Sequence, residues 1–498
     1  MSLQRFALHI AIRLAAPLAL GLALAGQAGA QTASPDPTAE AEGAKTVALL
    51  KQLIRFDTSN PSGDTAALAA FLRTQFEPLG VQIDVIPAPN GKAVHFIARL
   101  KGDGSKKPVL VAAHADVVPV ERDKWSVPPF EGVEKDGFVY GRGAMDFKGG
   151  MAVFARAVMR LAEQKVPLAR DVIFLAEADE EQGQYNTTWL ARDHWDRMDA
   201  EFALNEGGYI LQDAAGVVRQ VNVTTVEKMS VVLRLRANGP VGHASRPLPS
   251  NETANGKLIA ALEKLSVYEP GIQLIPQTRA YLAALARQNP GPVARGIDKI
   301  LAGADARTQA EGERELLKAK SSDAPLLRAL MHNTMAITMF KSGQAANVIP
   351  GEAEAIINAR LLPGATTDQL IDEVKRVVHD DSVIVDFATP ASQEATRNYY
   401  LAKSKTPESS TSTELYQSLQ KNAALIWPQA QTVPVLFEAG TDAVAWRERG
   451  VPVYGIYPYP LDADILKGMH GHDERIAVRS LYEGTDWVYR ILLDVAKK

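Results

Sequence analysis

The stretch PVLVAAHADVV (residues 108–118) is an almost unbroken apolar run that contains one histidine and one aspartate. Continuous apolar runs of this length are typical of strands that are buried on both faces of a sheet. Two similar runs follow, DVIFLAEA (171–178) and EFALNEGG (201–208), and the helical pattern GGMAVFARAVMRLAEQ (149–164) separates the first run from the second. Strands that alternate with helices predict an α/β domain with a central mixed, largely parallel sheet.

The pattern of apolar and polar residues changes near residue 226. SVVLRLRANG (230–239) alternates apolar and polar residues, as a half-solvated strand does, and charged helical patterns follow it. Continuous apolar runs like those of the first part return after about residue 395, in TVPVLFEAG and VPVYGIYPYP. We therefore expect the α/β domain to be interrupted by a smaller α+β lid domain. The predicted boundaries are 44–225 and 395–498 for the two parts of the catalytic domain and 226–394 for the lid.

The first thirty residues form a separate segment. Arg5 and Arg13 precede the apolar stretch 14–26, and small residues follow up to Ala30. This pattern predicts a secretory signal peptide that is cleaved after Ala30, and hence a periplasmic or secreted protein. The alternative is a membrane anchor, but the stretch is shorter than the ~20 apolar residues that a spanning helix needs. Residues 31–43 are polar and contain proline, which predicts a disordered lead-in.

Composition excludes several classes of protein and site. The formal net charge is −4, so neither a nucleic-acid partner nor, after signal cleavage, a membrane partner is expected. The chain has no cysteine. Disulfides and thiolate ligands are therefore excluded, and any metal ion must be held by nitrogen and oxygen atoms.

Candidate metal ligands follow the predicted strands. In open α/β sheets, binding sites form beyond the carboxyl ends of the strands, so these side chains are expected to meet. Imidazoles and carboxylates without sulfur suit zinc and, less selectively, manganese or cobalt. The carboxylates exceed the needs of one ion and predict two ions with a bridging carboxylate. The candidates are His114, Asp116, Asp146, Glu180, Glu181, Glu206, His470, His472, Asp473 and Glu474.

Five motifs occur in a characteristic order: H-x-D, G-R-G-x-x-D-x-K, a strand that ends in E-E, then E-G-G and H-x-x-D-E. Over residues 45–498 this order resembles the family of dinuclear zinc hydrolases that contains aminoacylase, carnosinase, carboxypeptidase G and carboxypeptidase S. The stretch W-x-x-P-P-F-x-G (125–132) is most similar to the carboxypeptidase S branch, which includes peptidases and N-acyl amino acid hydrolases.

The resemblance implies a pair of Zn²⁺ ions per chain, with Mn²⁺ or Co²⁺ as substitutes. It assigns one ion to His114 and Glu206, the other to Glu181 and His470, and the bridging position to Asp146. The spacing of the family motif favours His470 over His472, which is otherwise interpreted as a solvated loop histidine.

The resemblance also divides the labour of the acidic run DEE (179–181). Glu180 is implied as the general base, which takes a proton from a water between the ions and returns it to the leaving amine, whereas Glu181 binds metal. Asp116 is implied to fix the tautomer of His114 from behind. Asp179 is interpreted as a structural turn residue. His95, His194, His332 and His379 match no motif, and we expect them to be structural or exposed.

The predicted lid carries further candidates. The resemblance implies that His243 holds the carbonyl oxygen in the transition state, often in the active site of a partner subunit, so that a homodimer through the lid domain is expected. Asn347 and Arg360 are similar to the family's substrate clamp, and the planar guanidinium suits a carboxylate. Backbone and hydroxyl donors of Gly440 and Thr441 are expected to share that carboxylate.

The predicted function is metal-dependent hydrolysis of an amide bond in a peptide or N-acyl amino acid, next to a free carboxylate. The carboxypeptidase or dipeptidase type is preferred, with an aminoacylase-type N-acyl amino acid amidohydrolase as the alternative. Two other classes remain open, a non-catalytic binding protein on the same scaffold and a two-metal phosphoesterase. The latter lacks basic residues near the strand ends, where only Arg142 is available.

Overall fold

The computed structural model describes residues 37–303 and 305–498. The predicted signal peptide, residues 1–30, lies outside the described residues. Helix α1 (Pro37–Ile54) begins within the stretch 31–43 that the sequence predicts to be disordered, so the last part of that stretch is helical. Among the described residues, no helix is both long enough and apolar enough to cross a membrane.

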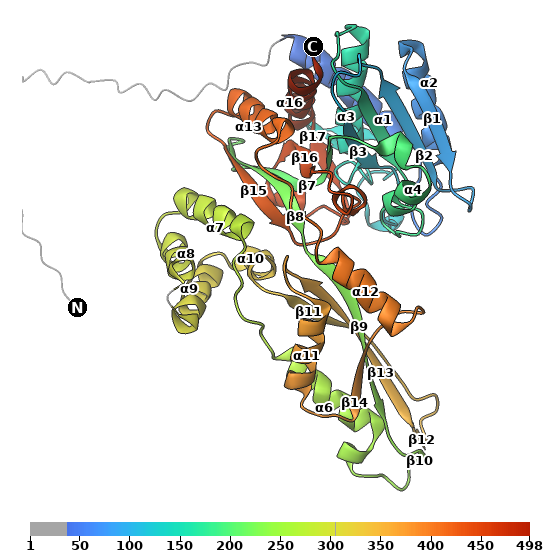
Figure 1. Cartoon of the computed structure of the whole chain (residues 1–498), viewed down its shortest axis with the longest axis vertical. Helices are drawn as coiled ribbons and strands as arrows, with labels where there is room; N and C mark the ends of the chain where they lie inside the picture. Colours follow the sequence, from blue (N-terminus) through green and yellow to red (C-terminus); the bar gives the residue numbers. More distant parts are fainter. Residues whose placement is uncertain (1–36, 304) are drawn as a thin grey trace, which may run out of the picture. The chain divides into compact units, whose positions relative to one another are not determined.

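The main sheet has eight strands in the order β1-β2-β6-β3-β7-β16-β8-β15 (Figure 1). Its central strands β6, β3, β7 and β16 are parallel to their neighbours in that group, whereas β1, β2 and the contacts of β8 with β7 and β16 are antiparallel. This mixed α/β sheet with a parallel centre confirms the predicted fold class. The strands are β1 (Gln82–Pro87), β2 (Val94–Leu100), β3 (Val109–His114), β6 (Val172–Glu177), β7 (Phe202–Gln212), β8 (Val218–Glu227), β15 (Gln431–Phe437) and β16 (Val453–Leu461).

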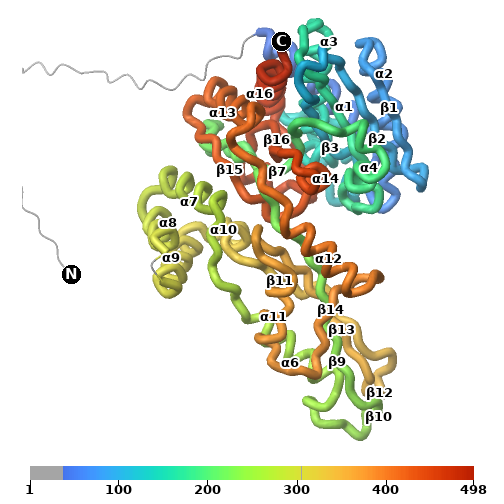
Figure 2. The backbone as a smooth tube through the Cα atoms, in the orientation of Figure 1, coloured from blue at the N-terminus to red at the C-terminus, as the bar shows by residue number. Residues whose placement is uncertain are grey.

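Helices cover both faces of this sheet, which explains the continuous apolar run of β3. Val109 and Val111 face a core that includes side chains of α1, α3 (Lys148–Glu163) and α16 (Val478–Ala496). Leu110 and Ala112 point the other way, into a core with α4 and α14. In Figure 2, α16 lies beside α1 and α3, as their contacts require. The other helices around the sheet are α2 (Ala66–Phe76), α4 (Thr187–Asp193), α5 (Trp195–Met198), α13 (Glu414–Ile426), α14 (Val444–Arg447) and α15 (Ala463–Leu466).

A small sheet connects two segments that are far apart in the sequence. Its strands, in the order β17-β5-β4, are Arg475–Ala477, Phe138–Tyr140 and Val133–Lys135. Arg475 on β17 pairs with Tyr140 on β5. The turn that follows β5 and the loop that precedes β17 are therefore held next to each other.

The second large sheet is antiparallel, with the strand order β11-β13-β9-β14. Alternate residues of β9 are buried, as the alternating sequence predicts, and they pack with helices α6 and α11. A two-stranded pair joins β10 (Gly242–His243) to β12 (Val348–Ile349). The remaining elements are β9 (Met229–Asn238), β11 (Thr334–Ser342), β13 (Glu352–Leu361), β14 (Val383–Phe387), α6 (Ala254–Ser266), α11 (Thr367–Val378) and α12 (Gln393–Lys403).

Four helices between α6 and β11 form a hydrophobic cluster of their own. They are α7 (Pro276–Gln288), α8 (Pro292–Ala302), α9 (Ala306–Ala319) and α10 (Ala324–Met331). Ala284 of α7 packs against Val433 and Val435 of β15, so the helices cover the edge strand of the main sheet. Sequence periodicity indicated charged helices here but not this edge contact.

The two sheets are joined where β8 ends at Glu227 and β9 begins at Met229. The predicted boundary at 225/226 falls just before the end of β8, and the predicted return at 394/395 falls within α12. Residues 37–498 form one compact unit. The division into catalytic and lid domains therefore stays a prediction.

Candidate metal centre and active site

Asp146 lies between two imidazole rings. Its Oδ1 is 3.1 Å from Nε2 of His114, and its Oδ2 is 3.0 Å from Nε2 of His470. The hydroxyl of Tyr457 donates a hydrogen bond of 3.0 Å to the same Oδ1. Although burial opposes the effect, the two imidazoles hold the pKa of Asp146 below its usual range. Each oxygen of this carboxylate thus faces the Nε2 atom of a different histidine, which is the arrangement required of a carboxylate that bridges two metal ions.

Two further carboxylates complete two groups around Asp146. Glu206 Oε2 is 3.5 Å from His114 Nε2, and Glu181 Oε1 is 3.3 Å from His470 Nε2. Hydrogen bonds to Asp146 and Glu181 raise the pKa of His470 to about 10. The structure therefore brings the five predicted ligands together in the predicted pairs. His472 lies apart from them, and its Nε2 is 3.0 Å from Glu121 Oε2 at the surface.

The donor set fits metal ions on its own chemistry. The potential ligand atoms of His114, Asp146 and Glu181 lie within 4.8 Å of one another, and so do those of His114, Glu180 and Glu206. Nδ1 of His114 is 2.9 Å from the backbone oxygen of Asp116. If Nδ1 carries the proton, the lone pair of Nε2 faces the carboxylates and is free to bind a cation.

Glu180 is a half-buried residue whose carboxyl group lies next to this cluster. Burial, followed by the nearby charge of Glu206, raises the pKa of Glu180 well above its usual range. A carboxylate with a raised pKa is a stronger base than an exposed one, and its conjugate acid can return the proton. The position of Glu180 is therefore compatible with acid and base chemistry rather than with a permanent ion pair.

Asp116 makes different contacts from those expected. The sequence implied that its carboxylate fixes the tautomer of His114, but Oδ1 lies 3.9 Å from Nδ1, and the backbone oxygen makes the hydrogen bond instead. The carboxylate accepts the backbone N–H groups of Glu180 and Glu181, each at 3.1 Å. The expectation is corrected because a backbone carbonyl lies closer to the ring than the side chain does.

Glu206 is not at a strand end. The sequence placed it beyond β7, but β7 continues to Gln212. The pairing of β7 with β16 shifts between Asn205 and Gly208, which leaves Glu206 and Gly207 unpaired in a bulge. Bulges redirect side chains next to active sites. A Cβ atom on Gly208 would lie 2.2 Å from the backbone oxygen of Asn222 on β8, which explains the second glycine of the E-G-G motif.

Arg142 and Glu474 form a brace that the sequence reasoning missed. The fully buried carboxylate of Glu474 accepts the backbone N–H groups of Gly143, Met145 and Asp146 at 2.8–3.0 Å. Arg142 donates to Glu474 at 2.6 Å and to the backbone oxygens of His470 and Gly471. The brace joins the turn of Asp146 to the loop of His470. The acidic end of H-x-x-D-E was the available signal, but its partners lie more than 300 residues away.

The predicted lid residues lie outside the cluster. His243 on β10 is exposed, and among the described residues its side chain hydrogen bonds only to Ser245. Asn347 is close to it, because β10 pairs with β12 and Asn347 O accepts the N–H group of Ala244. Arg360 on β13 forms no ion pair with a described residue, and partial burial lowers its pKa. These residues are therefore not joined to the metal ligands in this structure.

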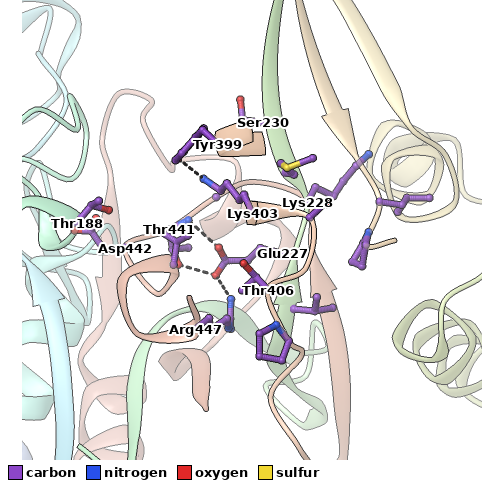
Figure 3. Close-up of a pocket in the computed structure, with 18 of the residues that line it drawn as sticks. Thr188, Glu227, Lys228, Ser230, Tyr399, Lys403, Thr406, Thr441, Asp442 and Arg447 are labelled. Carbon is purple, nitrogen blue, oxygen red and sulfur yellow. Dashed lines mark hydrogen bonds and ion pairs between the residues drawn. The ribbon is translucent and has the colours of Figure 1, made fainter. Parts of the chain in front are cut away.

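A pocket of 420 Å³ has Glu180, Gly440 and Thr441 among its lining residues. Thr441 does not offer free donors here, since its N–H and Oγ1 groups donate to Glu227 at 3.1 and 2.7 Å (Figure 3). Arg447 donates to the same carboxylate at 2.6 Å. Binding of a substrate carboxylate by Thr441 would require Glu227 to be displaced.

The sequence is similar to a family of known peptidases. A profile of the peptidase family M20/M25/M40 matches residues 110–494. A probable carboxypeptidase S-like 2 of Dictyostelium discoideum is 30% identical over 402 residues, which cover 79% of this chain and 73% of that protein. The N-fatty-acyl-amino acid synthase/hydrolase PM20D1 of Homo sapiens is 28% identical over 406 residues, which cover 80% of this chain and 76% of that protein.

The fold is also similar to a solved structure. An M20 family metallo-carboxypeptidase from Sulfolobus solfataricus superimposes with a TM-score of 0.62 at 16% sequence identity, over 91% of this chain and 98% of that one. At this identity the likeness concerns the fold.

Proposed function

Since the chain belongs to the peptidase family M20/M25/M40 and is a hydrolase, we propose that it cleaves the amide bond of a peptide or N-acyl amino acid beside a free carboxylate. The observation that carries this proposal is the position of Asp146 between His114 and His470, with the half-buried carboxyl of Glu180 beside them. The family's dependence on metal ions agrees with this donor set.

The proposed cofactor is a pair of Zn²⁺ ions, for which Mn²⁺ or Co²⁺ can substitute. His114 and Glu206 would hold one ion, Glu181 and His470 the other, and Asp146 would bridge them. Bound zinc ions supply Lewis acidity, which polarises a carbonyl group and makes water a better nucleophile at neutral pH. The brace of Arg142 and Glu474 supports the assignment, because it holds the turn of Asp146 against the loop of His470.

Glu180 is the proposed general base. Its carboxylate takes a proton from the attacking water and returns it to the leaving amine, and its raised pKa makes it a stronger base than an exposed glutamate. Asp116 orients this residue through the backbone N–H of Glu180. Arg360 is the proposed partner of the substrate carboxylate, because a half-buried guanidinium without an ion pair favours an anion. Gly440 and Thr441 remain proposed contributors from the pocket wall.

A second candidate, the N-acyl amino acid hydrolase, is compatible with the wall of the pocket beside Glu180. Met229, Leu362 and Val444 add apolar surface for an acyl chain, although charged residues such as Lys228 and Lys403 line the same pocket. One of the relatives acts on N-fatty-acyl amino acids according to its name. The phosphoesterase reading is disfavoured, because Arg142 already uses its donors on Glu474 and on the loop of His470.

A hydrolysis screen tests the proposal. Dipeptides, N-acyl amino acids of increasing chain length and phosphomonoesters are incubated with zinc and with a chelator, and Glu180→Gln serves as the matched inactive control. We expect zinc-dependent cleavage of amides only. Cleavage of phosphomonoesters would contradict the proposal, and substrate binding without turnover would identify a non-catalytic binding protein on this scaffold.

We further propose a homodimer formed through the lid. Strand β11 is the edge of the antiparallel sheet, and its residues Ile337, Met339 and Phe340 are 42%, 64% and 49% exposed. An exposed apolar edge strand is a template for pairing with another chain. A partner subunit would cover it and would bring its His243 and Asn347 to a second active site.

Complementation tests the dimer. A mixture of His243→Ala and Glu180→Gln chains, refolded together, should recover activity that neither variant has alone, because mixed dimers contain one complete site. A monomer by analytical ultracentrifugation, or no recovery in the mixture, would refute the assignment.

The proposed location is the periplasm or the exterior of the cell. It rests on the charged and apolar pattern of residues 1–30. The mature protein should begin at Gln31, which N-terminal sequencing of the exported chain would establish. An intact Met1 on the active protein would contradict export by cleavage after Ala30.

A further inference from the structure

The loop between β6 and α4 carries both Glu180 and Glu181. It leaves the sheet after Glu177 and reaches α4 at Thr187. A metal ligand and a proton-transfer group are therefore neighbours on one short connection, and their side chains must be directed to different atoms. The directions of the two side chains depend on the contacts that fix the backbone of the loop.

His95 of β2 touches both ends of this loop. Its ring is fully buried. Nδ1 is 3.2 Å from the backbone nitrogen of Ala178, and Nε2 is 2.9 Å from the backbone oxygen of Tyr185. A backbone N–H group can only donate and a carbonyl can only accept. Nδ1 must therefore accept, and Nε2 must carry the proton and donate.

This arrangement requires a neutral imidazole. Burial lowers the pKa of His95 to about 4, so the ring keeps both hydrogen bonds over the neutral range. The ring also stacks on Trp189 of α4, with 5.7 Å between ring centroids. His95 thus connects β2 to both ends of the loop and to helix α4, which follows the loop.

Contacts within the loop carry this constraint towards the two acids. Asp179 adopts a left-handed conformation with a φ of 66°, its backbone oxygen accepts Gly183 N at 2.7 Å, and its Oδ2 accepts Tyr185 N at 2.6 Å. The segment from Ala178 to Tyr185 is therefore a closed turn whose two ends His95 connects. Asp116 then holds the backbone N–H groups of Glu180 and Glu181 from the other side.

We propose that His95 is a positioning residue, which by bridging Ala178 N–H and Tyr185 C=O sets where the carboxyl group of Glu180 lies. The inference rests on the proposed function for its catalytic consequence, but its structural part concerns the loop alone. An error of about 1 Å in the position of a reacting group can cost about 100-fold in rate.

Three substitutions separate the two hydrogen bonds. His95→Asn keeps an acceptor near the position of Nδ1, His95→Gln keeps a donor near the position of Nε2, and His95→Phe keeps the ring against Trp189 without either bond. His194 is the matched control, because its ring also contacts Trp189 at 5.7 Å but makes no hydrogen bond to the loop among the described residues. His194→Phe should therefore behave as wild type.

The first measurement is amide hydrogen exchange of the loop in the protein without substrate. In His95→Phe the amides of Ala178, Glu180 and Glu181 should exchange about tenfold faster or more, whereas those of β6 should be unchanged. His95→Asn should restore protection at Ala178. Unchanged exchange in His95→Phe, or equally faster exchange throughout β6 and the loop, would overturn the proposal whatever the enzyme hydrolyses.

The second measurement separates positioning from general stability. Per folded and metal-loaded chain, kcat of His95→Phe should fall about 10- to 100-fold, with KM changed by less than about twofold. His95→Asn should recover more of kcat than His95→Gln, because the Ala178 bond is nearer to Glu180. An unchanged kcat per folded chain in all three variants would overturn the catalytic consequence, and absence of amide hydrolysis by the wild-type enzyme would concern only the proposed function.

Discussion

The metal cluster and the pair His243 and Asn347 differ in how they are held. In the cluster, each oxygen of Asp146 faces a fixed partner, and the turn that carries it is hydrogen bonded to a fully buried Glu474. His243 is exposed and is bonded only to its own loop among the described residues. The candidate ligands on the main sheet are brought together within the fold itself, whereas the candidate residues of the predicted lid lie apart from them. The proposed roles of His243 and Asn347 therefore depend on closure or on a partner subunit.

The largest expected effect follows from breaking the cluster. Asp146→Ala should reduce metal content below two equivalents per chain and lower kcat/KM by at least about 100-fold. Loss of a residue that only orients a metal ligand already costs up to about 100-fold in activity, and loss of the ligand itself should cost no less. Elemental analysis after gentle dialysis, together with kinetics, measures both. Asp473→Ala is a control on the loop of His470, outside the cluster, where Asp473 accepts the N–H group of Ser126. Full activity with a single tightly bound ion would contradict a bridging role.

Substitution of the adjacent residues Glu180 and Glu181 tests whether they have different roles in the cluster. Glu180→Gln should keep the metal ions and lose about 10²–10⁴-fold in kcat, the usual contribution of a general base. Glu181→Gln should instead bind metal more weakly and regain activity in excess zinc. Equal loss of metal in both variants, with equal recovery, would show that the two acids share one role.

Arg360 tests whether the lid acts on the substrate alone. Arg360→Ala should leave the metal content unchanged and weaken kcat/KM for substrates with a free carboxylate by about 2–5 kcal/mol, the cost of leaving a buried charge unpaired. Selectivity against substrates with an amidated terminus should fall in parallel. Wild-type enzyme that cleaves free and amidated substrates equally well would refute the clamp.

The smallest expected effect lies within the predicted lid, between helix α9 and the residue that follows α10. His332 Nε2 is 2.9 Å from Glu313 Oε1, and although burial opposes it, this contact raises the pKa of His332. A raised pKa in the folded state gives stability that is fully present below the unfolded pKa of about 6.5 and is lost as pH rises through the folded value. The melting temperature should therefore fall by a few degrees or less over that interval.

Glu313→Gln is the control for this pH effect. The melting temperature of the variant should fall less than that of the wild type over this interval, and metal content should be unchanged, because the contact lies outside the cluster. An equal or larger fall in the variant would contradict the assigned direction.

Local patterns in the sequence predicted the parallel centre of the sheet, and the family resemblance selected the five candidate ligands that the structure brings together. Apolar runs such as 109–114 mark strands buried on both faces, and parallel strands end at one edge, so acids and histidines that follow them converge. The motif order then separated His470 from His472, and the structure places only His470 among the ligands.

Contacts between distant segments were decided by the tertiary structure. The sequence could not show that Asp116 holds the backbone of Glu180, that a bulge within β7 directs Glu206, or that Glu227 occupies the donors of Thr441. The helices that cover β15 and the bridge made by His95 belong to the same class. Periodicity predicts which face of an element is buried. The partner of a single polar group depends instead on the packing of segments that are distant in the sequence, such as those of Arg142 and Glu474, 332 positions apart.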